Sequence, residues 1–422
     1  MIKWSKSRIS RFLETAPAGR ALFLADGVLI RLARWTARNA GQLRPVETLV
    51  IAAPGRGNIG DQALLEAALD NSTGSVLVLV KDNEDFTLPP RYRDRVTVAE
   101  SRHLLYGDPV RRAVDYLRFL AHARSAKKVW LIGADTMDGA YNALASVTRY
   151  SAVYGAAAMG AQTRVLGFSW NDHATASAAW WARRCTSTVE LWARDPVSLE
   201  RLASDGAVGV RLCADIVFAR DCTVAADSEA SVWIESQREG GRNVAVVNCS
   251  GLIGSDATKL AQYRYLVDWL EANSWSIVFV PHVIRPGNDD LALIREVVHG
   301  SGEHRLVIER LLSPDAIFSL VSQVDVVVTG RMHLAVLSVL SGIIPITLAT
   351  QGKVEGLYRM LACENLCIEP NADFGTKITD IWDEMLAVNQ TFDRESPLLN
   401  DVRNLAKLGL GQLEPTSVLE TR

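Results

Sequence analysis

The chain has 422 residues, of which 48% are hydrophobic and 22% are charged, and its formal net charge is −3. This length is enough for two or three domains with their own cores, and the small net charge excludes the strongly basic surface of a typical nucleic-acid-binding protein. The six cysteines show no C-x-x-C pair and no Cys/His spacing of a zinc site. We therefore expect reduced thiols, a cytoplasmic location and no structural metal.

Residues 1–44 form a basic arm with nine Lys and Arg against Glu14 and Asp26, which gives nine minus two, a local charge of +7. If residues 20–38 form a helix, four arginines lie along one stripe of it: Arg20, Arg31, Arg34 and Arg38. Four apolar residues lie largely away from that stripe: Leu22, Leu29, Leu32 and Trp35. Such a helix either contacts the inner face of the cell membrane peripherally or packs on its own protein with its arginines in solvent. Its apolar part, about 13 residues, is shorter than a bilayer requires, and it does not resemble a signal peptide.

Beyond the arm, short apolar runs alternate with helical patterns, which is typical of a doubly wound α/β protein. In the first half we expect strands over residues 47–54, 75–80, 127–134, 163–170, 189–194 and 210–218. In the second half we expect strands over residues 243–250, 276–283, 305–309, 324–330 and 343–350. Helices are expected after Asp61 and over residues 139–160, 258–271 and 314–322.

A polar stretch over residues 221–241 separates the two halves and reads as a linker. The prediction is therefore two Rossmann-like doubly wound domains that face a cleft, over residues 45–225 and 240–396. A helical tail over residues 397–422 follows and is expected to pack back on the body.

The first expected strand leads into the sequence APGRGNIGDQALLEAAL, in which Gly55, Gly57 and Gly60 have the spacing G-x-G-x-x-G. With Asp82 at the end of the next strand, this pattern keeps an NAD(P)-dependent enzyme as an alternative. Asp61 argues against it, because a carboxylate in the first helical turn would repel a pyrophosphate. Asp61 more plausibly caps the helix or faces a hydroxyl, and the glycines alone are also explained by a tight turn with close backbone packing.

The most informative segment is TGRMHLAVLSVLSGIIPITLATQGKVEGL, residues 329–357. A buried strand is expected to end at Gly330, and a buried helix follows whose first turn presents unpaired backbone N–H groups, a favourable place for an anion. If the next strand runs parallel, its exit brings Lys353 to the same sheet edge as Arg331 and His333. The alternative is a structural arginine at a helix end and a core histidine.

Four segments in this order resemble the polysaccharide pyruvyl transferase family: GNIGD before a helix, RDPVS after a strand, FVPH, and the block from VDVVVTGRMH to GKVEGL. The resemblance spans roughly residues 47–365 and implies a two-domain GT-B-like fold. It also implies phosphoenolpyruvate as the donor. The implied acceptor is a sugar diol of a cell-surface polysaccharide or glycolipid precursor, either free or linked to a lipid. The chain departs from the family at GADTMDG, where members carry a Gly-rich turn, and at GFSWND, where they carry Gly-Pro.

On this resemblance, we expect the carboxylate and phosphate of the donor to be bound by several basic side chains: Arg194, Arg331, His333, Lys353 and His282. His333 is the candidate acid that protonates the enol carbon, and an orienting or phosphate-binding imidazole is the alternative. Asp61 is the candidate base, and the expected acceptor-binding residues are Asn58, Asp61, Asp135 and His173.

Other interpretations stay open for these residues and for the whole chain. Arg194 and Asp195 are alternatively a surface ion pair, and the spacing of Asp135 and Asp138 does not by itself make a metal site. No metal and no cofactor is expected beyond phosphoenolpyruvate as co-substrate. A nucleotide-sugar glycosyltransferase of similar architecture, an NAD(P)-dependent dehydrogenase and a sugar-binding protein without activity are the competing functions.

Overall fold

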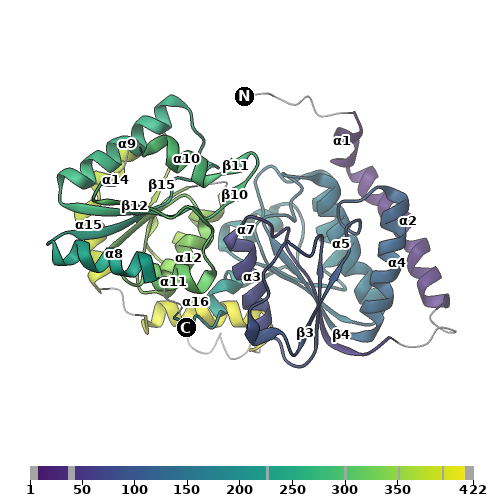
Figure 1. The fold of residues 1–422 in the computed structure, drawn as a ribbon. Helices are drawn as coiled ribbons and strands as arrows, with labels where there is room; N and C mark the ends of the chain where they lie inside the picture. The colour runs from purple at the N-terminus through teal and green to yellow at the C-terminus, as the bar shows by residue number, and fades with distance from the viewer. Residues whose placement is uncertain are drawn as a thin grey trace. The chain divides into compact units, whose positions relative to one another are not determined.

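The computed structural model of the protein describes residues 8–36, 43–224, 228–298, 302–349, 352–391 and 394–413 (Figure 1). The chain forms two compact units. Within the described residues, unit 1 takes the chain up to Pro54, residues 68–216 and the part from Leu405 on, and unit 2 takes residues 55–67 and 217–404. Each unit contains one large parallel sheet with helices between its strands, so the predicted α/β class is confirmed.

Unit 1 has a seven-stranded parallel sheet in the order β3-β2-β1-β4-β5-β6-β7. Its central strands are almost fully buried because their Val, Leu and Ile runs are covered on both faces. The strands are β1 (Val46–Ile51), β2 (Val76–Val80), β3 (Val96–Glu100), β4 (Ala126–Ala134), β5 (Gln162–Phe168), β6 (Glu190–Ala193) and β7 (Arg211–Leu212). β7 is shorter than the strand expected over residues 210–218, because the chain turns there into the 3-10 helix η2 (Ile216–Ala219).

The helices of unit 1 begin at side chains that cap them, as the sequence pattern of Asp, Asn and Thr before apolar runs favours. Asp108, Asn142 and Thr175 each accept a hydrogen bond from a backbone N–H of the following helix. The elements are α1 (Arg8–Leu13), α2 (Ala16–Thr36), the 3-10 helix η1 (Pro90–Tyr92), α4 (Pro109–Ser125), α5 (Ala143–Ala158), α6 (Ala176–Cys185) and α7 (Pro196–Ser204).

Unit 2 has a six-stranded parallel sheet in the order β12-β9-β8-β13-β14-β15. Its strands are β8 (Asn243–Val247), β9 (Trp275–Phe279), β12 (Arg305–Val307), β13 (Val326–Thr329), β14 (Ile346–Leu348) and β15 (Cys367–Ile368). β10 (Ile284–Arg285) and β11 (Asn288–Asp289) form a separate antiparallel hairpin. β13 and β14 are parallel neighbours, which is the condition on which the sequence placed Lys353 at the same sheet edge as Arg331.

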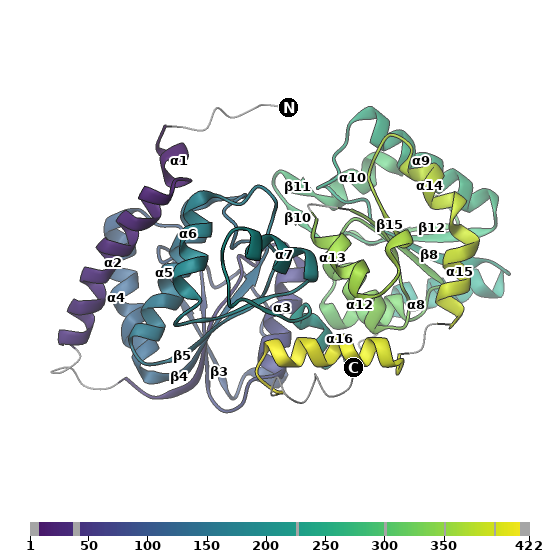
Figure 2. The ribbon, with the colours of Figure 1, turned by 180° about the vertical axis from the view of Figure 1, so that it is seen from behind.

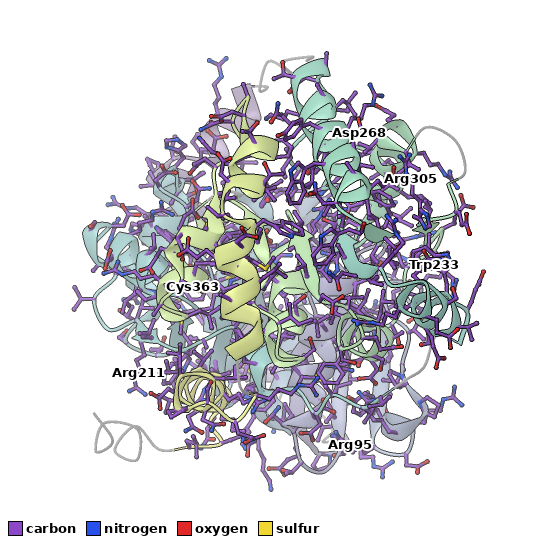
Figure 3. All side chains as sticks on the ribbon, turned by 90° about the vertical axis from the view of Figure 1, so that its left-hand side faces the viewer. Arg95, Arg211, Trp233, Asp268, Arg305 and Cys363 are labelled. Carbon is purple, nitrogen blue, oxygen red and sulfur yellow. The ribbon has the colours of Figure 1, made fainter. Side chains whose placement is uncertain are left out.

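The helices of unit 2 include one in the stretch over residues 221–241, where we expected a linker, and that expectation is wrong for residues 228–239. The helices are α8 (Ser228–Glu239), α9 (Ala257–Ala272), α10 (Asp290–Val297), α11 (Pro314–Val321), α12 (Met332–Leu340), α13 (Lys353–Met360), the 3-10 helix η3 (Glu364–Leu366), α14 (Phe374–Asp380) and α15 (Trp382–Thr391). In Figure 3, which draws the side chains of both units, the label Trp233 marks α8, Asp268 marks α9 and Arg305 marks the edge strand β12.

A segment from the first half of the chain belongs to unit 2. Residues 55–67 contain the glycine loop and the part of α3 (Ile59–Asp70) up to Ala67. Arg220, whose side chain is fully buried, pairs with Glu66 of this segment and with Asp315 of α11. These two carboxylates overcome the effect of burial and raise the pKa of Arg220. The ion cluster ties α3 to unit 2.

The tail beyond residue 397 contains the predicted helix, α16 (Pro397–Gly409), whose C-terminal end contacts unit 1. Arg164 of β5 donates to the carbonyl oxygens of Leu408 at 3.2 Å and Gly409 at 3.0 Å. The six cysteines carry free thiols, four of them buried. None of the helices in the described part of the chain has the length and apolar character needed to cross a membrane.

Candidate functional site

The corner after β13 is where the predicted anion site lies. The strand ends at Thr329, and Arg331 is the N-cap residue of α12. A Cβ atom on Gly330 would lie 2.6 Å from Ile253 Cδ1 and 2.7 Å from Ser250 Cβ, so only glycine lets the chain turn this close to the loop after β8. Thr329 Oγ1 accepts from the Arg331 N–H at 2.9 Å, which fixes the turn.

Arg331 is buried and is held by Asp290, the first residue of α10. Its Nε lies 3.1 and 3.2 Å from the two carboxylate oxygens, and its Nη2 donates to Asp290 Oδ1 and to Asn288 Oδ1. Asp290 has no exposed surface and also accepts from Asn248 Nδ2 and from three backbone N–H groups, those of Gly251, His282 and Val283. The orientation of the guanidinium is therefore set by a fully buried carboxylate.

The pKa of Asp290 shows how firmly this pair is held. Burial alone raises the pKa of a carboxyl group, but the charge and hydrogen bonds of Arg331, with those from Gly251 and Asn248, outweigh it and lower the pKa below the ordinary value. Asp290 is therefore ionised at neutral pH, and Arg331 keeps its partner.

Hydrogen-bond donors remain at this corner after the internal bonds are formed. Arg331 Nη1 has no partner among the described residues, and the same is true there of the backbone N–H groups of Met332 and Leu334 in the first turn of α12. The side chain of its N-cap residue, Arg331, makes no capping hydrogen bond to the helix. A helix N-terminus with unpaired N–H groups beside a guanidinium is favourable for an oxyanion.

Two histidines lie at the same corner. The Cβ position of Gly60 is 2.3 Å from His333 Nδ1, so the imidazole ring of His333 packs directly against the glycine loop. His282 is 1% exposed, and neither of its ring nitrogens has a hydrogen-bond partner within the part of the chain that the structure describes. Burial, followed by the positive charges of His333 and Arg331, lowers the pKa of His282 to about 3, against the opposing effect of Asp290. His282 is thus neutral at neutral pH, when one ring N–H can still donate to an anion.

The glycine loop is attached to the β10–β11 hairpin. Ile59 N donates to the His282 carbonyl at 3.1 Å, and Ile284 N donates to the Gly57 carbonyl at 2.9 Å. Gly57 has a φ of +74°, and a Cβ on it would lie 2.3 Å from the Ile284 carbonyl oxygen. Close backbone packing thus accounts for Gly57, and the loop itself brings Gly60 against His333.

The two polar residues of this loop, Asn58 and Asp61, both accept hydrogen bonds from its backbone. Asn58, rather than Asp61, caps α3, since Asn58 Oδ1 accepts from the Gly60 N–H at 3.0 Å. Asp61 is buried and accepts from the Gly55 N–H at 3.2 Å, which closes the loop. Both side chains lie beside the histidine corner, because their loop packs on His333 and on the hairpin. Their roles toward an acceptor stay predictions.

Lys353 is the first residue of α13 and follows β14. Because β14 runs parallel to β13, with Val328 aligned with Ile346, both strands end at the same edge of the sheet. Gly352 before it has a φ of +76°, and residues 350 and 351 lie outside the described part of the chain. The sheet topology expected for Lys353 is confirmed, and its contact with a donor stays a prediction.

Arg194 belongs to unit 1, and its alternative as a surface ion pair with Asp195 is wrong. Arg194 is buried, with Nε donating to Ser169 Oγ at 2.7 Å and Nη1 to Asp215 Oδ2 at 2.9 Å. Asp195 instead caps α7 and accepts from the Ser198 N–H at 2.7 Å. Burial raises the pKa of Asp195, although the hydrogen bonds of Ser198 oppose the change.

The other residues expected on the acceptor side also lie in unit 1. Asp138 is buried and accepts from the backbone N–H groups of Ala140 and Asn171, so it orders the loops after β4 and β5. Asp135 accepts a long hydrogen bond from Tyr141 at 3.4 Å, and the side chain of His173 is 88% exposed. Asp82, considered for a ribose, organises its own turn by accepting from the Glu84 N–H. The roles of Asp135 and His173 toward an acceptor stay predictions.

Sequence reasoning missed Asp290, Asn288 and Asn248, which hold Arg331 in place. The one signal for the hairpin is Pro286-Gly287, a turn dipeptide, with Gly287 at a φ of +77° directly before Asn288. Nothing in the sequence distinguishes Asp290 from a surface carboxylate at the start of a helix. Among the described residues, no group of three or more His, Cys, Asp or Glu side chains is arranged to hold a metal ion.

A family model described as polysaccharide pyruvyl transferase matches residues 58–352, which is more than half of the chain. No curated protein sequence matches the chain.

Solved structures with the same fold share little sequence identity with this chain. A UDP-GlcNAc 2-epimerase from Methanocaldococcus jannaschii has a TM-score of 0.53 and 9% identity, over 89% of this chain and 99% of that one. A trehalose-6-phosphate synthase has a TM-score of 0.54 and 11% identity, over 87% of this chain and 100% of that one. These enzymes have the GT-B fold, and at such identities they establish the fold alone.

Proposed function

The chain belongs to the polysaccharide pyruvyl transferase family, and we propose that it transfers the enolpyruvyl group of phosphoenolpyruvate to a sugar diol. The product is a pyruvate ketal on a polysaccharide or glycolipid precursor, and inorganic phosphate is released. The observation that carries the proposal is the corner after β13, where an oriented guanidinium, the N-terminus of α12 and the buried imidazole of His282 lie together.

Phosphoenolpyruvate suits this corner because it carries a carboxylate and a phosphate on one carbon. Arg331 Nη1 and the N–H groups of Met332 and Leu334 supply donors for one oxyanion, and a neutral His282 supplies another. Asp290 has already fixed Arg331, so donor binding needs little reorganisation. Asp290 also offsets the formal charge of Arg331. Further cations are therefore needed, and Lys353 and Arg194 remain our proposal for them.

The reaction begins with a proton from His333 to the CH₂ carbon of the donor, which becomes a methyl group and leaves a cationic C2. His282 does not serve as this acid at neutral pH, since its lowered pKa keeps it neutral. One sugar hydroxyl adds to C2, the bond between C2 and the phosphate oxygen breaks, and the second hydroxyl closes the ketal. Of the two hydroxyl protons released, one restores His333 and the other leaves with phosphate. Asp61 is the proposed base that takes the proton from the attacking hydroxyl and passes it on to His333. Asn58 is the proposed group that positions the sugar.

The test is phosphate release from phosphoenolpyruvate by the full-length protein with a panel of sugar diols. We expect release only when an acceptor is present, in excess EDTA, with a product heavier by one pyruvate less one water. Thermal melting checks the donor separately, because a ligand at 100 times its Kd adds about 2.7 kcal/mol of stability. Stabilisation by UDP-sugars or NAD(P)H instead of phosphoenolpyruvate, or strict dependence on added Mg²⁺, would contradict the proposal.

A further inference from the structure

Helix α2 lies on the outer side of unit 1 (Figure 2), and it carries a ridge of large exposed apolar side chains. Leu24, Val28 and Trp35 are 69%, 61% and 63% exposed, and Leu32 is 41% exposed. Their spacing of three, four or seven residues places them on one face of the helix. Single exposed apolar side chains need no explanation, but a line of four on one helix indicates a contact surface.

The opposite face of α2 is anchored, so the ridge cannot turn inward. Its buried residues include Asp26, which pairs with Arg112 of α4 at 2.7 Å and accepts from Ser151 of α5. Arg34 donates to the Ala158 carbonyl at the end of α5. Breaking the buried Asp26–Arg112 pair would leave an unpaired charge in the core, at a cost that a rotation of the helix does not repay. The alternative that α2 packs on its own protein is therefore confirmed, and the helix still exposes an apolar face.

Positive charge accompanies the ridge. Arg20 and Arg31 are exposed along one flank of it, and Arg11 is exposed on α1 beside Phe12. The two acidic residues between positions 8 and 36 do not balance them, since Asp26 is buried in its ion pair and Glu14 is half-buried. The outward side of α2 thus combines apolar and cationic groups without an exposed carboxylate in that range.

We propose that this ridge docks in the plane of the interface onto a bilayer that contains anionic lipids. Leu24, Val28 and Trp35 enter the headgroup region, and the flanking arginines contact lipid phosphates. Tryptophan favours this depth because its ring is apolar and its N–H is polar. A second copy of the chain is a poorer partner, because a two-fold contact through the ridge would bring the same arginine-flanked patches together. The inference is independent of the reaction proposed above.

Co-sedimentation of the full-length protein with vesicles of phosphatidylcholine, with and without phosphatidylglycerol, tests the proposal. We expect binding only with phosphatidylglycerol, and its loss at 1 M salt, where the screening length is about 3 Å. The double variant Arg20→Gln/Arg31→Gln should bind about thirtyfold more weakly, from about 1 kcal/mol per basic residue. Leu24→Ser/Val28→Ser should weaken binding at least about tenfold, by removal of the apolar contact.

Matched substitutions on α8 and α10 of unit 2 provide the controls: Val232→Ser and Arg295→Gln, both at exposed side chains. They should leave vesicle binding unchanged. Wild-type protein that ignores phosphatidylglycerol vesicles at low salt overturns the proposal, as does equal loss of binding in the controls. Light scattering without lipid tests whether a second copy of the chain binds the ridge instead. If the ridge variants turn a dimer into a monomer, the ridge is a subunit interface and not a membrane contact.

Discussion

Two corners of the molecule are built alike, each from a parallel strand, an arginine and a helix. In unit 2, Arg331 follows β13 and precedes α12; in unit 1, Arg194 follows β6 and precedes α7. Both arginines are buried and pair with a carboxylate, Asp290 or Asp215. The difference lies in the helix: the N-cap residue of α7, Asp195, caps it with its carboxylate, whereas the N-cap residue of α12, Arg331, makes no capping hydrogen bond.

This difference teaches when a helix N-terminus is available to a ligand. At α7 the positive end already faces the carboxylate of Asp195, so a second anion would meet a negative charge. At α12 the carboxylate of Asp290 is turned to Arg331, and the backbone N–H groups of Met332 and Leu334 have no partner in the described part of the chain. Strand, arginine and helix alone therefore do not identify an anion site; the cap residue decides.

The largest effect is expected from Arg331→Lys. Lysine keeps the charge but loses the planar fork that binds Asp290 on one side and the donor on the other. We expect kcat/KM for phosphoenolpyruvate to fall about 10²–10³-fold, by analogy with the loss of one oxyanion donor. Phosphate release measures it, and a melting curve shows that the protein remains folded. Unchanged turnover would remove Arg331 from the donor site.

Arg194→Lys and Arg295→Lys complete that experiment. Arg194→Lys should lower kcat/KM by only about tenfold, which corresponds to one charge-assisted hydrogen bond, because its helix end is already filled. Arg295, an exposed arginine paired with Glu309, should tolerate lysine without effect. Equal losses of kcat/KM at Arg331 and Arg194 would contradict the difference between the two corners.

The next effect is expected from Gly60→Ala. The new Cβ would lie 2.3 Å from His333 Nδ1, so the imidazole must rotate away. We expect kcat to fall at least tenfold and stability to fall by about 1–3 kcal/mol, the usual range for overpacking. Gly27→Ala in α2 is the control, because nothing lies within 4 Å of its Cβ position, and alanine there should add up to about 1 kcal/mol. Full activity of Gly60→Ala would show that His333 is not held by this loop.

His282 predicts a pH effect on stability in unit 2. Its pKa is about 3 in the folded protein and near the ordinary 6.5 when unfolded, so between these values the unfolded chain binds the extra proton. Stability should therefore fall as pH falls from 6.5 to 3, by up to about 1.4 kcal/mol per pH unit from this group. Denaturant titrations of wild type and His282→Gln measure the difference, and phosphoenolpyruvate should make the slope shallower by favouring a charged imidazole. An identical slope in the variant would contradict the lowered pKa.

The smallest effect is expected from Asp195→Ala in unit 1. Loss of the cap of α7 should reduce stability by about 1 kcal/mol. The kcat/KM for phosphoenolpyruvate should change little, as Asp195 is not a donor ligand in our proposal. A large gain in affinity for phosphoenolpyruvate would instead indicate that the Asp195 carboxylate blocks a second anion site at the N-terminus of α7.

The sequence predicts the parts of the fold that rest on local patterns. The run VDVVVTG, the apolar helix after it and the run up to Thr350 predicted β13, α12 and β14, because buried parallel strands and buried helices need apolar residues throughout. β3 escaped prediction because its exposed polar residues, Thr97 and Glu100, break the apolar run. α8 escaped prediction because only Ala230, Ile234 and Gln237 form its buried side, within an otherwise polar stretch.

The site was predictable only in part, for the same physical reason. Arg331 and His333 could be found because they stand at a strand end before a helix, a position defined by neighbours in sequence. Asp290 could not, because its role depends on a contact with Arg331 across 41 positions of the chain. The partner of Arg194, Asp215, was missed likewise, since the adjacent Asp195 offers the simpler pairing in sequence. Local patterns place side chains at an edge, and only the fold selects their partners.

The membership of residues 55–67 in unit 2 has a consequence for protein synthesis. The glycine loop leaves the ribosome early, but the residues it packs on, Val283, Ile284 and His333, are made more than 200 positions later. Unit 1 cannot be completed earlier either, because it includes residues from Leu405 on. Neither unit is thus complete until nearly the whole chain has been translated, which differs from the usual sequence of N-terminal domain first. A fragment cut at residue 217 would carry Arg220 without Glu66 and His333 without its loop.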